Sequence, residues 1–304
     1  MMDKKEISTY IKAEAECLGF DICGIAQAMP VNSETIRYCN DWLKEGNNGS
    51  MGYLERNCDK RYDPTLLVDG CRSIIVVAMN YTPAGQINGI SDYAQGHDYH
   101  KAVKERLFRL LKSINDIMPC NGRAFCDSAP VLERYWAVQA GLGWIGKNRQ
   151  LIIPGRGPQF FIGELLVDIE LDYDRPFEGE RCGECRRCLE QCPTAALSSH
   201  GFDARKCLSY LTIEHRGELP ENIGKKMKNS FYGCDCCQKA CPHSRFAVPN
   251  SIAELQPSPE LMRMNDDDWK NLTEEQYKRL FAHSAVERCG YEQLRRNIKA
   301  LESK

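Results

Sequence analysis

The sequence predicts a mixed α/β (α+β) protein in three parts. These are an N-terminal part of helices and strands over residues 1–172, a cysteine-rich part over 173–245 and a short helical tail over 246–304. Three observations support this division. Helical and strand periodicities alternate before the cysteines, and charged residues at helical spacing follow them. Between these regions, nine of the seventeen cysteines lie from Cys182 to Cys241.

Each N-terminal element follows from a local pattern. Ile7–Leu18 places apolar residues on one helical face, and Ser73–Tyr81 is the continuous β-branched run typical of a buried strand. Asp98–Met118 has apolar residues at steps of three and four and is stopped by Pro119, so it predicts an amphipathic helix. Further strands are expected at Ala124–Cys126, Leu151–Ile153 and Phe160–Ile169.

Composition and charge exclude several classes of protein. Of 304 residues, 42% are hydrophobic and 27% charged, which is typical of a globular chain and not of a disordered one. Forty basic residues against 42 acidic ones give a net charge of −2, so a basic coat for nucleic acid is excluded. The polar N-terminus and the short apolar run Ile74–Met79 predict a soluble, cytoplasmic protein. In that compartment, seventeen cysteines favour metal or redox chemistry over disulfides.

The cysteine spacing predicts two [4Fe–4S] clusters. The first run, Cys182-x2-Cys185-x2-Cys188-x3-Cys192-Pro, is the bacterial ferredoxin pattern, in which the cysteine before proline ligates the other cluster. A second run, Cys234-x2-Cys237-x3-Cys241-Pro, lacks its first cysteine, which Cys207 can supply. The expected ligands are Cys182, Cys185, Cys188 and Cys241 for one cluster and Cys192, Cys207, Cys234 and Cys237 for the other.

Two points remain open at this stage. CxxC pairs also bind zinc, although zinc sites usually present two separated pairs and not runs that end in Cys-Pro. Cys236 is the ninth cysteine of the segment and is left over, so it is interpreted as a bystander.

Several long motifs resemble those of the epoxyqueuosine reductases, bacterial enzymes of tRNA modification that use cobalamin and two [4Fe–4S] clusters. They include residues 127–134 (DSAPVLER), 140–148 (AGLGWIGKN) and 232–238 (YGCDCCQ), with further matches at 93–100, 207–214 and 290–298. The resemblance covers nearly the whole chain. It implies a cobalamin-binding catalytic domain at 1–172, a ferredoxin-like domain with two clusters at 173–245, and a tail at 246–304 that can contact tRNA.

The resemblance also implies the reaction. The family reduces epoxyqueuosine to queuosine at the wobble position of tRNA, with reduced cobalamin that receives electrons through the clusters. Asp127 matches the proton donor, and burial against the corrin is expected to raise its pKa. On residue chemistry alone, Asp127 is also a fair helix N-cap before Pro130.

The same resemblance implies the residues that bind cobalamin. They are Arg61, Tyr99, Asp127, Leu151, Ile162, Ser209 and Asp235. Arg61 could equally be a surface cation paired with Asp59 or Asp63. Leu151 and Ile162 could be ordinary core, and Ser209 and Asp235 could make loop hydrogen bonds. His100 lies in a D-x-H motif but lacks the glycine of His-ligated cobalamin proteins, since position 103 is Val103. We therefore expect base-off cobalamin with no protein ligand to cobalt.

The expected partners are tRNA carrying epoxyqueuosine and an external low-potential electron donor. Arg216 and Gly217 match a family loop that contacts tRNA, and other basic residues surround the clusters. No membrane partner is expected, and the protein is expected to be a monomer. The alternatives are an enzyme like the cobalamin-dependent reductive dehalogenases and a non-enzymatic carrier of the ferredoxin type.

Overall fold

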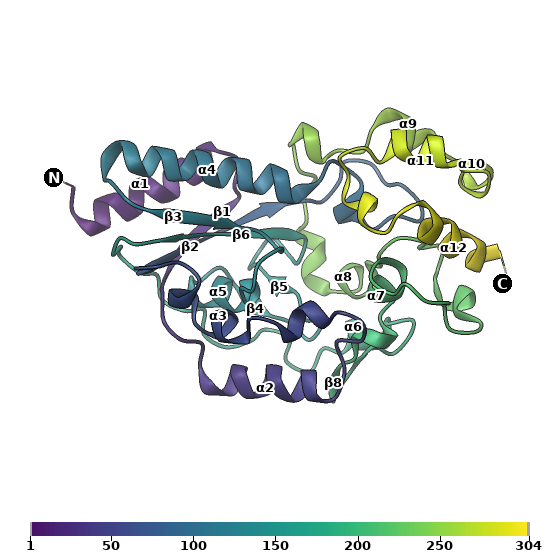
Figure 1. Ribbon diagram of the computed structural model, residues 1–304, viewed down its shortest axis with the longest axis horizontal. Helices are drawn as coiled ribbons and strands as arrows, with labels where there is room; N and C mark the ends of the chain where they lie inside the picture. The colour runs from purple at the N-terminus through teal and green to yellow at the C-terminus, as the bar shows by residue number, and fades with distance from the viewer. Residues whose placement is uncertain (1, 303–304) are drawn as a thin grey trace.

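The computed structural model describes residues 2–302 and is built on one four-stranded antiparallel sheet (Figure 1). The strand order is β1 (Ile22–Gln27), β2 (Ser73–Asn80), β6 (Phe160–Val167) and β3 (Gly122–Phe125). The central strands β2 and β6 pair along their full length, from Ser73 opposite Val167 to Asn80 opposite Phe160. Every residue of β2 is buried, because helices cover both faces of the sheet.

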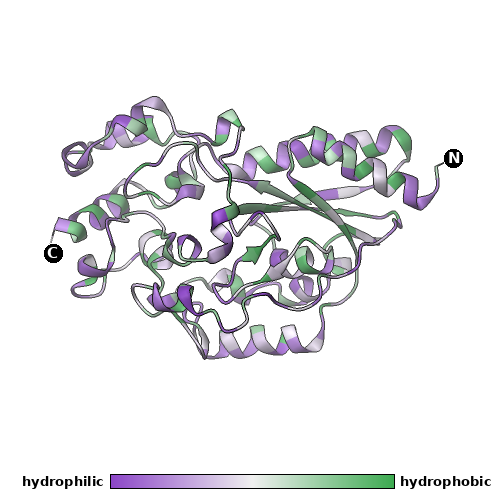
Figure 2. Cartoon of the chain, turned by 180° about the vertical axis from the view of Figure 1, so that it is seen from behind, coloured by the Kyte–Doolittle hydropathy of each residue, from purple (hydrophilic) through white to green (hydrophobic). Residues whose placement is uncertain are grey.

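The two faces of the sheet have separate cores. On one face, α1 (Lys4–Cys17) and α4 (Tyr99–Ile117) pack over Ile75 and Val77. On the other face, α5 (Glu133–Gln139) packs over the alternate residues of the same strand. Figure 2 shows hydrophobic residues along the strands and hydrophobic stripes along the helices that cover them. This alternation is the period of two that a β-strand imposes.

The remaining elements are short. The other helices are α2 (Ser33–Lys44), α3 (Cys58–Tyr62), α6 (Arg187–Glu190), α7 (Leu208–Ile213), α8 (Cys236–Lys239), α9 (Pro259–Arg263), α10 (Asp266–Lys270), α11 (Glu274–Leu280) and α12 (Tyr291–Glu302). Two hairpins are formed by β4 (Trp144–Ile145) with β5 (Leu151–Ile152), and by β7 (Leu197–Ser198) with β8 (Gly201–Phe202). Single 3₁₀ turns lie at Gly52–Glu55, Pro64–Leu66, Asp92–Ala94, Ala204–Lys206, Ile223–Lys226, Pro242–Phe246, Ala253–Leu255 and Ala285–Arg288.

A third hydrophobic cluster joins all three parts of the chain. It contains Ile90 from the N-terminal part, α7 and Tyr232 from the cysteine-rich part, and Phe281 and Leu294 from the tail. The tail thus supplies much of the core on which the cysteine-rich segment packs. The proposed domain boundaries stay a prediction.

The expected elements of the N-terminal part are present. The helices predicted at Ile7–Leu18 and Asp98–Met118 are α1 and α4, and Asp98 caps α4 by accepting the backbone N–H of His100. The strand predicted at Ser73–Tyr81 is β2, and the three weaker strand predictions correspond to β3, β5 and β6. Between residues 2 and 302, no helix combines the length and the apolar content needed to cross a membrane.

We expect Asn297→Ala to destabilise the fold strongly. Asn297 is fully buried and its amide donates to the carbonyls of Thr212 (2.8 Å) and Phe231 (2.9 Å), which ties α12 to the cysteine-rich part. The Phe231 carbonyl then loses its donor, while the Thr212 carbonyl keeps that of Gln293. The loss is about 1–3 kcal/mol, so the melting temperature of the cluster-loaded protein should fall by a few degrees. Arg295→Ala, at an exposed position of the same helix, is the control. Equal melting temperatures for the two variants would contradict the tie.

Candidate active site

Asp127 lies in a strained loop between β3 and α5. Its φ is 58°, in the left-handed region that residues other than glycine rarely adopt. The N–H of Ser128 donates to the carbonyl of Cys126 at 2.6 Å, which closes a tight turn around Asp127. The helix that follows begins only at Glu133, after Leu132, so Asp127 is not its N-cap. The alternative role of Asp127 as a cap is therefore wrong.

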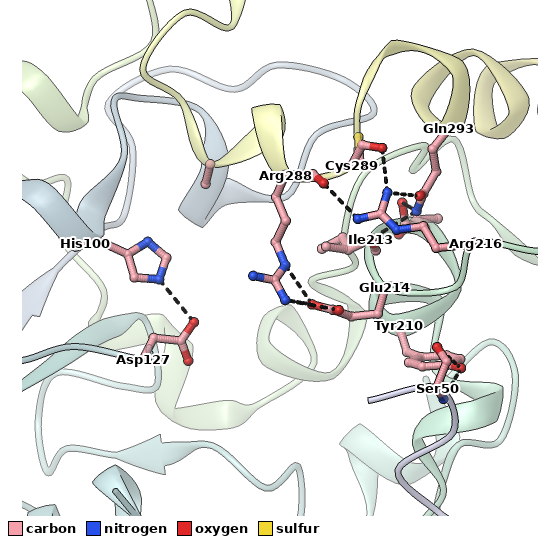
Figure 3. A network of polar contacts seen from close by, with 12 residues as sticks. Ser50, His100, Asp127, Tyr210, Ile213, Glu214, Arg216, Arg288, Cys289 and Gln293 are labelled. Carbon is pink, nitrogen blue, oxygen red and sulfur yellow. Dashed lines mark hydrogen bonds and ion pairs between the residues drawn. The ribbon is translucent and has the colours of Figure 1, made fainter. Parts of the chain in front are cut away.

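The first two residues of α4 hold the carboxylate of Asp127. The hydroxyl of Tyr99 donates to Asp127 Oδ2 at 2.7 Å, and His100 Nε2 lies 3.4 Å from the same oxygen. The other ring nitrogen of His100 is 2.6 Å from Asp98 Oδ1. Tyr99 is itself fixed between the rings of His100 and Phe161, at centroid distances of 4.1 and 4.2 Å. Figure 3 shows the imidazole directed at Asp127.

The charges in this group favour a protonated imidazole. Burial lowers the pKa of His100, but the hydrogen bonds to Asp127 and Asp98 outweigh it and raise this pKa to about 9. Burial would raise the pKa of Asp127, but His100 and Tyr99 together lower it to about 2. The chain's own groups therefore lower the pKa of Asp127, whereas the sequence analysis expected burial against the corrin to raise it. At neutral pH the transferable proton is on His100 and Asp127 is ionised.

Further polar groups face Asp127 from other parts of the chain. Arg288 forms an ion pair with Glu214 at 2.8 Å, and Asp127 is among the groups that raise the pKa of Arg288. Figure 3 shows this ion pair beside the Asp127–His100 pair. Burial raises the pKa of Tyr53, and both Glu214 and Asp127 add to that rise. Sequence reasoning missed all three residues. Glu214 ends the 207–214 stretch that resembles the family, whereas no motif marks Tyr53 or Arg288.

Arg61 is almost buried and holds the chain segment that carries Tyr53. Its guanidinium donates to the carbonyls of Leu54 (2.5 Å) and Arg56 (3.2 Å). Arg61 thus pairs with backbone carbonyls and does not form the surface ion pair with Asp59 or Asp63 that was the alternative. A contact between Arg61 and a cofactor stays a prediction.

The other four residues expected at the corrin come from the N-terminal part and from the cysteine-rich part. Leu151 and Ile162 are buried in the core beneath α5. Ser209 is on α7, while Asp235 accepts hydrogen bonds from the hydroxyl of Ser91 and from a backbone N–H. The core positions of Leu151 and Ile162 and the hydrogen bonds of Asp235 are the contacts that the sequence left as alternatives. Their role toward a corrin stays a prediction.

The cysteines assigned to the first cluster come together. Burial raises the pKa of Cys188, and the nearby thiols of Cys182 and Cys241 add to the rise. Burial likewise raises the pKa of Cys241, with further contributions from Cys182 and Cys185. These four thiols therefore lie close enough to influence one another, as ligands of one cubane must.

The second set also gathers in one place. Burial, followed by the nearby Cys207 and Cys192, raises the pKa of Cys237 to about 12. Contact with Cys236 raises the pKa of Cys234, and Cys207 adds to it. Cys236 thus lies against Cys234, and its interpretation as a bystander stays a prediction. Among residues 2–302, no three His, Cys, Asp or Glu side chains converge as a single metal ion would require.

A hollow of about 580 Å³ lies beside Cys241 of the first cysteine group. Arg187, Lys239, Cys241 and Arg245 are among its lining residues, whereas Asp127 is not. Lys239 is paired with Asp92 at 3.1 Å, and the guanidinium of Arg245 lies over the ring of Phe246. The hollow is therefore separate from the Asp127 site and places cationic side chains beside a cluster cysteine.

Arg216 has a structural role that the sequence did not reveal. Its guanidinium donates to the carbonyls of Cys289 (2.7 Å) and Arg288 (2.8 Å) and to the side chain of Gln293, as Figure 3 shows. These bonds tie the loop after α7 to the tail, close to Arg288. Gly217 is exposed in the same loop. Contact of Arg216 and Gly217 with nucleic acid stays a prediction.

Comparison with protein families identifies the two main segments. Residues 181–244 match the 4Fe-4S double cluster binding domain, and residues 61–128 match the domain described as epoxyqueuosine reductase QueG, DUF1730. The first match confirms the prediction of two iron–sulfur clusters. The second match ends just after Asp127 and includes Tyr99 and His100.

Similar structures share the fold over nearly the whole chain. The epoxyqueuosine reductase of Streptococcus thermophilus has a TM-score of 0.86 at 28% identity, covering 96% of this chain and 80% of that one. An epoxyqueuosine reductase solved with an epoxyqueuosine-modified tRNA-Tyr stem loop has a TM-score of 0.87 at 26% identity, with the same coverage. The Bacillus subtilis enzyme, with a TM-score of 0.85 at 26% identity over 96% of this chain and 80% of its own, is described with its catalytic aspartate loop swung out of the active site. A reductive dehalogenase, at 18% identity and a TM-score of 0.53, shares the fold alone.

Relatives in sequence settle the family. The epoxyqueuosine reductase of Cellulophaga algicola is 44% identical over 308 residues, which cover 99% of this chain and all of that protein. The enzyme of Pseudomonas aeruginosa is 38% identical over 97% of this chain and 85% of its own length. With these identities over nearly its full length, the chain belongs to the epoxyqueuosine reductases, a family of oxidoreductases.

Proposed function

We propose that this protein reduces epoxyqueuosine to queuosine in tRNA. The observation that carries the proposal is the carboxylate of Asp127, 61% exposed, held by Tyr99 and His100 within the matched family domain. Loss of the epoxide oxygen as water, leaving a carbon–carbon double bond, consumes two electrons and two protons. The site therefore needs a source of electrons and a group that delivers protons to the leaving oxygen.

Asp127 and His100 together supply the proton. His100 holds the proton at neutral pH, and its Nε2 lies 3.4 Å from Asp127 Oδ2. The side chain of Asp127 is more exposed than that of His100. As negative charge develops on the epoxide oxygen, the proton passes from the imidazolium through the Asp127 carboxylate to that oxygen. Burial and Asp127 raise the pKa of Tyr99 well above its usual value. Tyr99 therefore stays a hydrogen-bond donor that orients Asp127.

Cobalamin is the cofactor that we propose for the electron-transfer chemistry at the epoxide. When bound, it supplies a strongly reducing cobalt centre at the substrate ring. The donor set fits base-off cobalamin without a protein ligand, because both nitrogens of His100 face carboxylates. Arg61, Tyr99, Leu151, Ile162, Ser209 and Asp235 are the residues that we propose to hold it.

Two iron–sulfur clusters, when bound, would supply the electrons one at a time. We propose Cys182, Cys185, Cys188 and Cys241 as ligands of one cluster and Cys192, Cys207, Cys234 and Cys237 as ligands of the other. An external low-potential donor reduces them, and the cationic hollow beside Cys241 is a suitable place for its approach.

The substrate proposal rests on the relative solved with a modified tRNA stem loop. Because the chain has a net negative charge, we propose that a local group of basic residues binds tRNA. The loop of Arg216 and Gly217 is part of the surface that we propose. A dehalogenase-like activity is less well supported, because the similarity to the reductive dehalogenases is limited to the fold and Tyr99 is held as a donor to Asp127. Membership of this family of oxidoreductases argues against the alternative of a non-enzymatic electron carrier.

Replacing Asp127 tests the proton-transfer role. Asp127→Asn keeps the shape of the side chain but cannot relay a proton from His100, so turnover should fall by about a hundredfold or more. The measurement is queuosine formation by mass spectrometry, with reconstituted protein, cobalamin, reductant and tRNA carrying epoxyqueuosine. Asp116→Asn, at an exposed position of α4, is the matched control. Full turnover by Asp127→Asn, with cobalamin and tRNA bound, would exclude the role.

The pH dependence tests whether His100 stores the proton. Because the protonated imidazole is the active form and its pKa is about 9, turnover should be high below that pH and fall as pH rises through it. Asp98→Asn removes a group that raises this pKa, so the fall should move to lower pH. His100→Gln should have lower turnover and lack this fall. An unchanged profile in His100→Gln would show that another group titrates.

The absence of a cobalt ligand is tested by electron paramagnetic resonance. Protein loaded with Co(II) cobalamin should show no hyperfine splitting from a protein nitrogen, because the ring of His100 is occupied by Asp98 and Asp127. A splitting that disappears in His100→Gln would refute base-off binding without a protein ligand. Cobalamin binding itself is read from the absorption spectrum of the same samples.

A further inference from the structure

The loop that carries Asp127 is held at Asp127 and Ser128 by specific polar contacts. Its backbone is strained at Asp127, and such strain persists only where surrounding contacts impose it. The side chain of Asp127 is held by Tyr99 and His100. The side chain of Lys104 donates to the hydroxyl of Ser128 at 2.8 Å. The backbone of Asp127 is held as well, because its N–H donates to the carboxyl group of Glu133.

Glu133 is well placed to fix this loop. It is the first residue of α5, and the cap residue before it, Leu132, makes no side-chain hydrogen bond. Trp136 and Ala137, one turn along, are buried against the sheet, so the base of the Glu133 side chain is rigid. Its carboxyl group therefore connects the strained backbone of Asp127 to the core.

A second carboxyl group is buried beneath Glu133. Glu164 lies on β6 between Ile162 and Leu166 of the face that α5 covers, and it is wholly buried. Within residues 2–302, neither of its carboxyl oxygens has a hydrogen-bond partner. A buried charge without a partner is very costly, so Glu164 is carried as the neutral acid.

The three carboxyl groups influence one another. Burial, followed by Glu133 and Asp127, raises the pKa of Glu164 well above its usual value. Burial and the charge of Asp127 also raise the pKa of Glu133 to about 8. Near neutral pH Glu133 is thus mostly neutral and can accept the Asp127 N–H through its carbonyl oxygen. Asp127 is then the one ionised member of the three.

We propose that Glu133 is a positioning residue that latches the Asp127 loop in its working conformation, with Glu164 as a neutral support beneath it. This inference rests on the proposed role of Asp127 in proton transfer. Glu133 acts through the backbone of Asp127 and not on the substrate. Loss of the latch should release the strained turn and move the carboxylate away from His100, while leaving the clusters and the tRNA-binding surface in place.

The test combines hydrogen exchange with turnover in the reconstituted holoenzyme. In Glu133→Ala, amide exchange of the peptide spanning 126–132 should be about tenfold faster or more, because the hydrogen bond that holds the Asp127 N–H is lost. The kcat for epoxyqueuosine in tRNA should fall by at least about tenfold, with KM changed less than about twofold. Glu133→Gln keeps an acceptor oxygen and should restore both values to within about threefold of the wild type. Glu164→Gln, which is also neutral, should resemble the wild type.

Controls separate the latch from general damage. Gln139→Ala, at the end of the same helix, should change neither readout, and cluster absorbance should be equal in all variants. Slow exchange in Glu133→Ala, or a Glu133→Gln variant as impaired as Glu133→Ala, would overturn the latch. A large loss in Glu164→Gln would overturn its supporting role. If Asp127→Asn keeps full turnover, the proposed proton-transfer role of Asp127 fails, whereas exchange in Glu133→Ala still reports on the latch by itself.

Discussion

The antiparallel pairing of β2 with β6 determines where the chemically important side chains of the sheet lie. In this register Phe161 points to the face covered by α4 and stacks on Tyr99, whereas Glu164 points to the face covered by α5. The same strand pairs on its other side with β3, whose end delivers Asp127. A shift of one residue would exchange the two faces and separate both contacts at once. The site therefore depends on the register of one strand.

The cysteine-rich part depends on the tail in a similar way. Its own sequence provides α7 and the segment before Cys234, and the tail completes their core with Phe281 and Leu294. Hydrogen bonds from Arg216 and Asn297 join the same surfaces. The Arg288–Glu214 ion pair spans this junction and lies within electrostatic reach of Asp127. The packing that supports the cluster loops thus also shapes one side of the active site.

Sequence alone predicted the features that local patterns determine. The cysteine spacing, the apolar run of β2 and the period of α4 are local, and each was recovered. The charge state of the site was not, because it depends on residues that are apart in the chain: the fold, and no local pattern, brings Asp127 to His100 and Tyr99. Arg216 shows the same limit, since its partners lie more than seventy residues away. Glu164 did leave a signal, as one acid within an apolar strand, but nothing in the sequence says what it faces.

The distribution of protons explains why neutral acids can lie beneath an ionised one. The imidazolium of His100 is balanced by Asp98 and Asp127, and Arg288 is balanced by Glu214. Two more negative charges at Glu133 and Glu164 would repel each other and the carboxylate of Asp127. Keeping both as neutral acids avoids that repulsion, which leaves Asp127 ionised and so keeps the proton on His100. The buried acids and the proton store are therefore parts of one electrostatic arrangement, in which the neutral state of the first favours the charged state of the second.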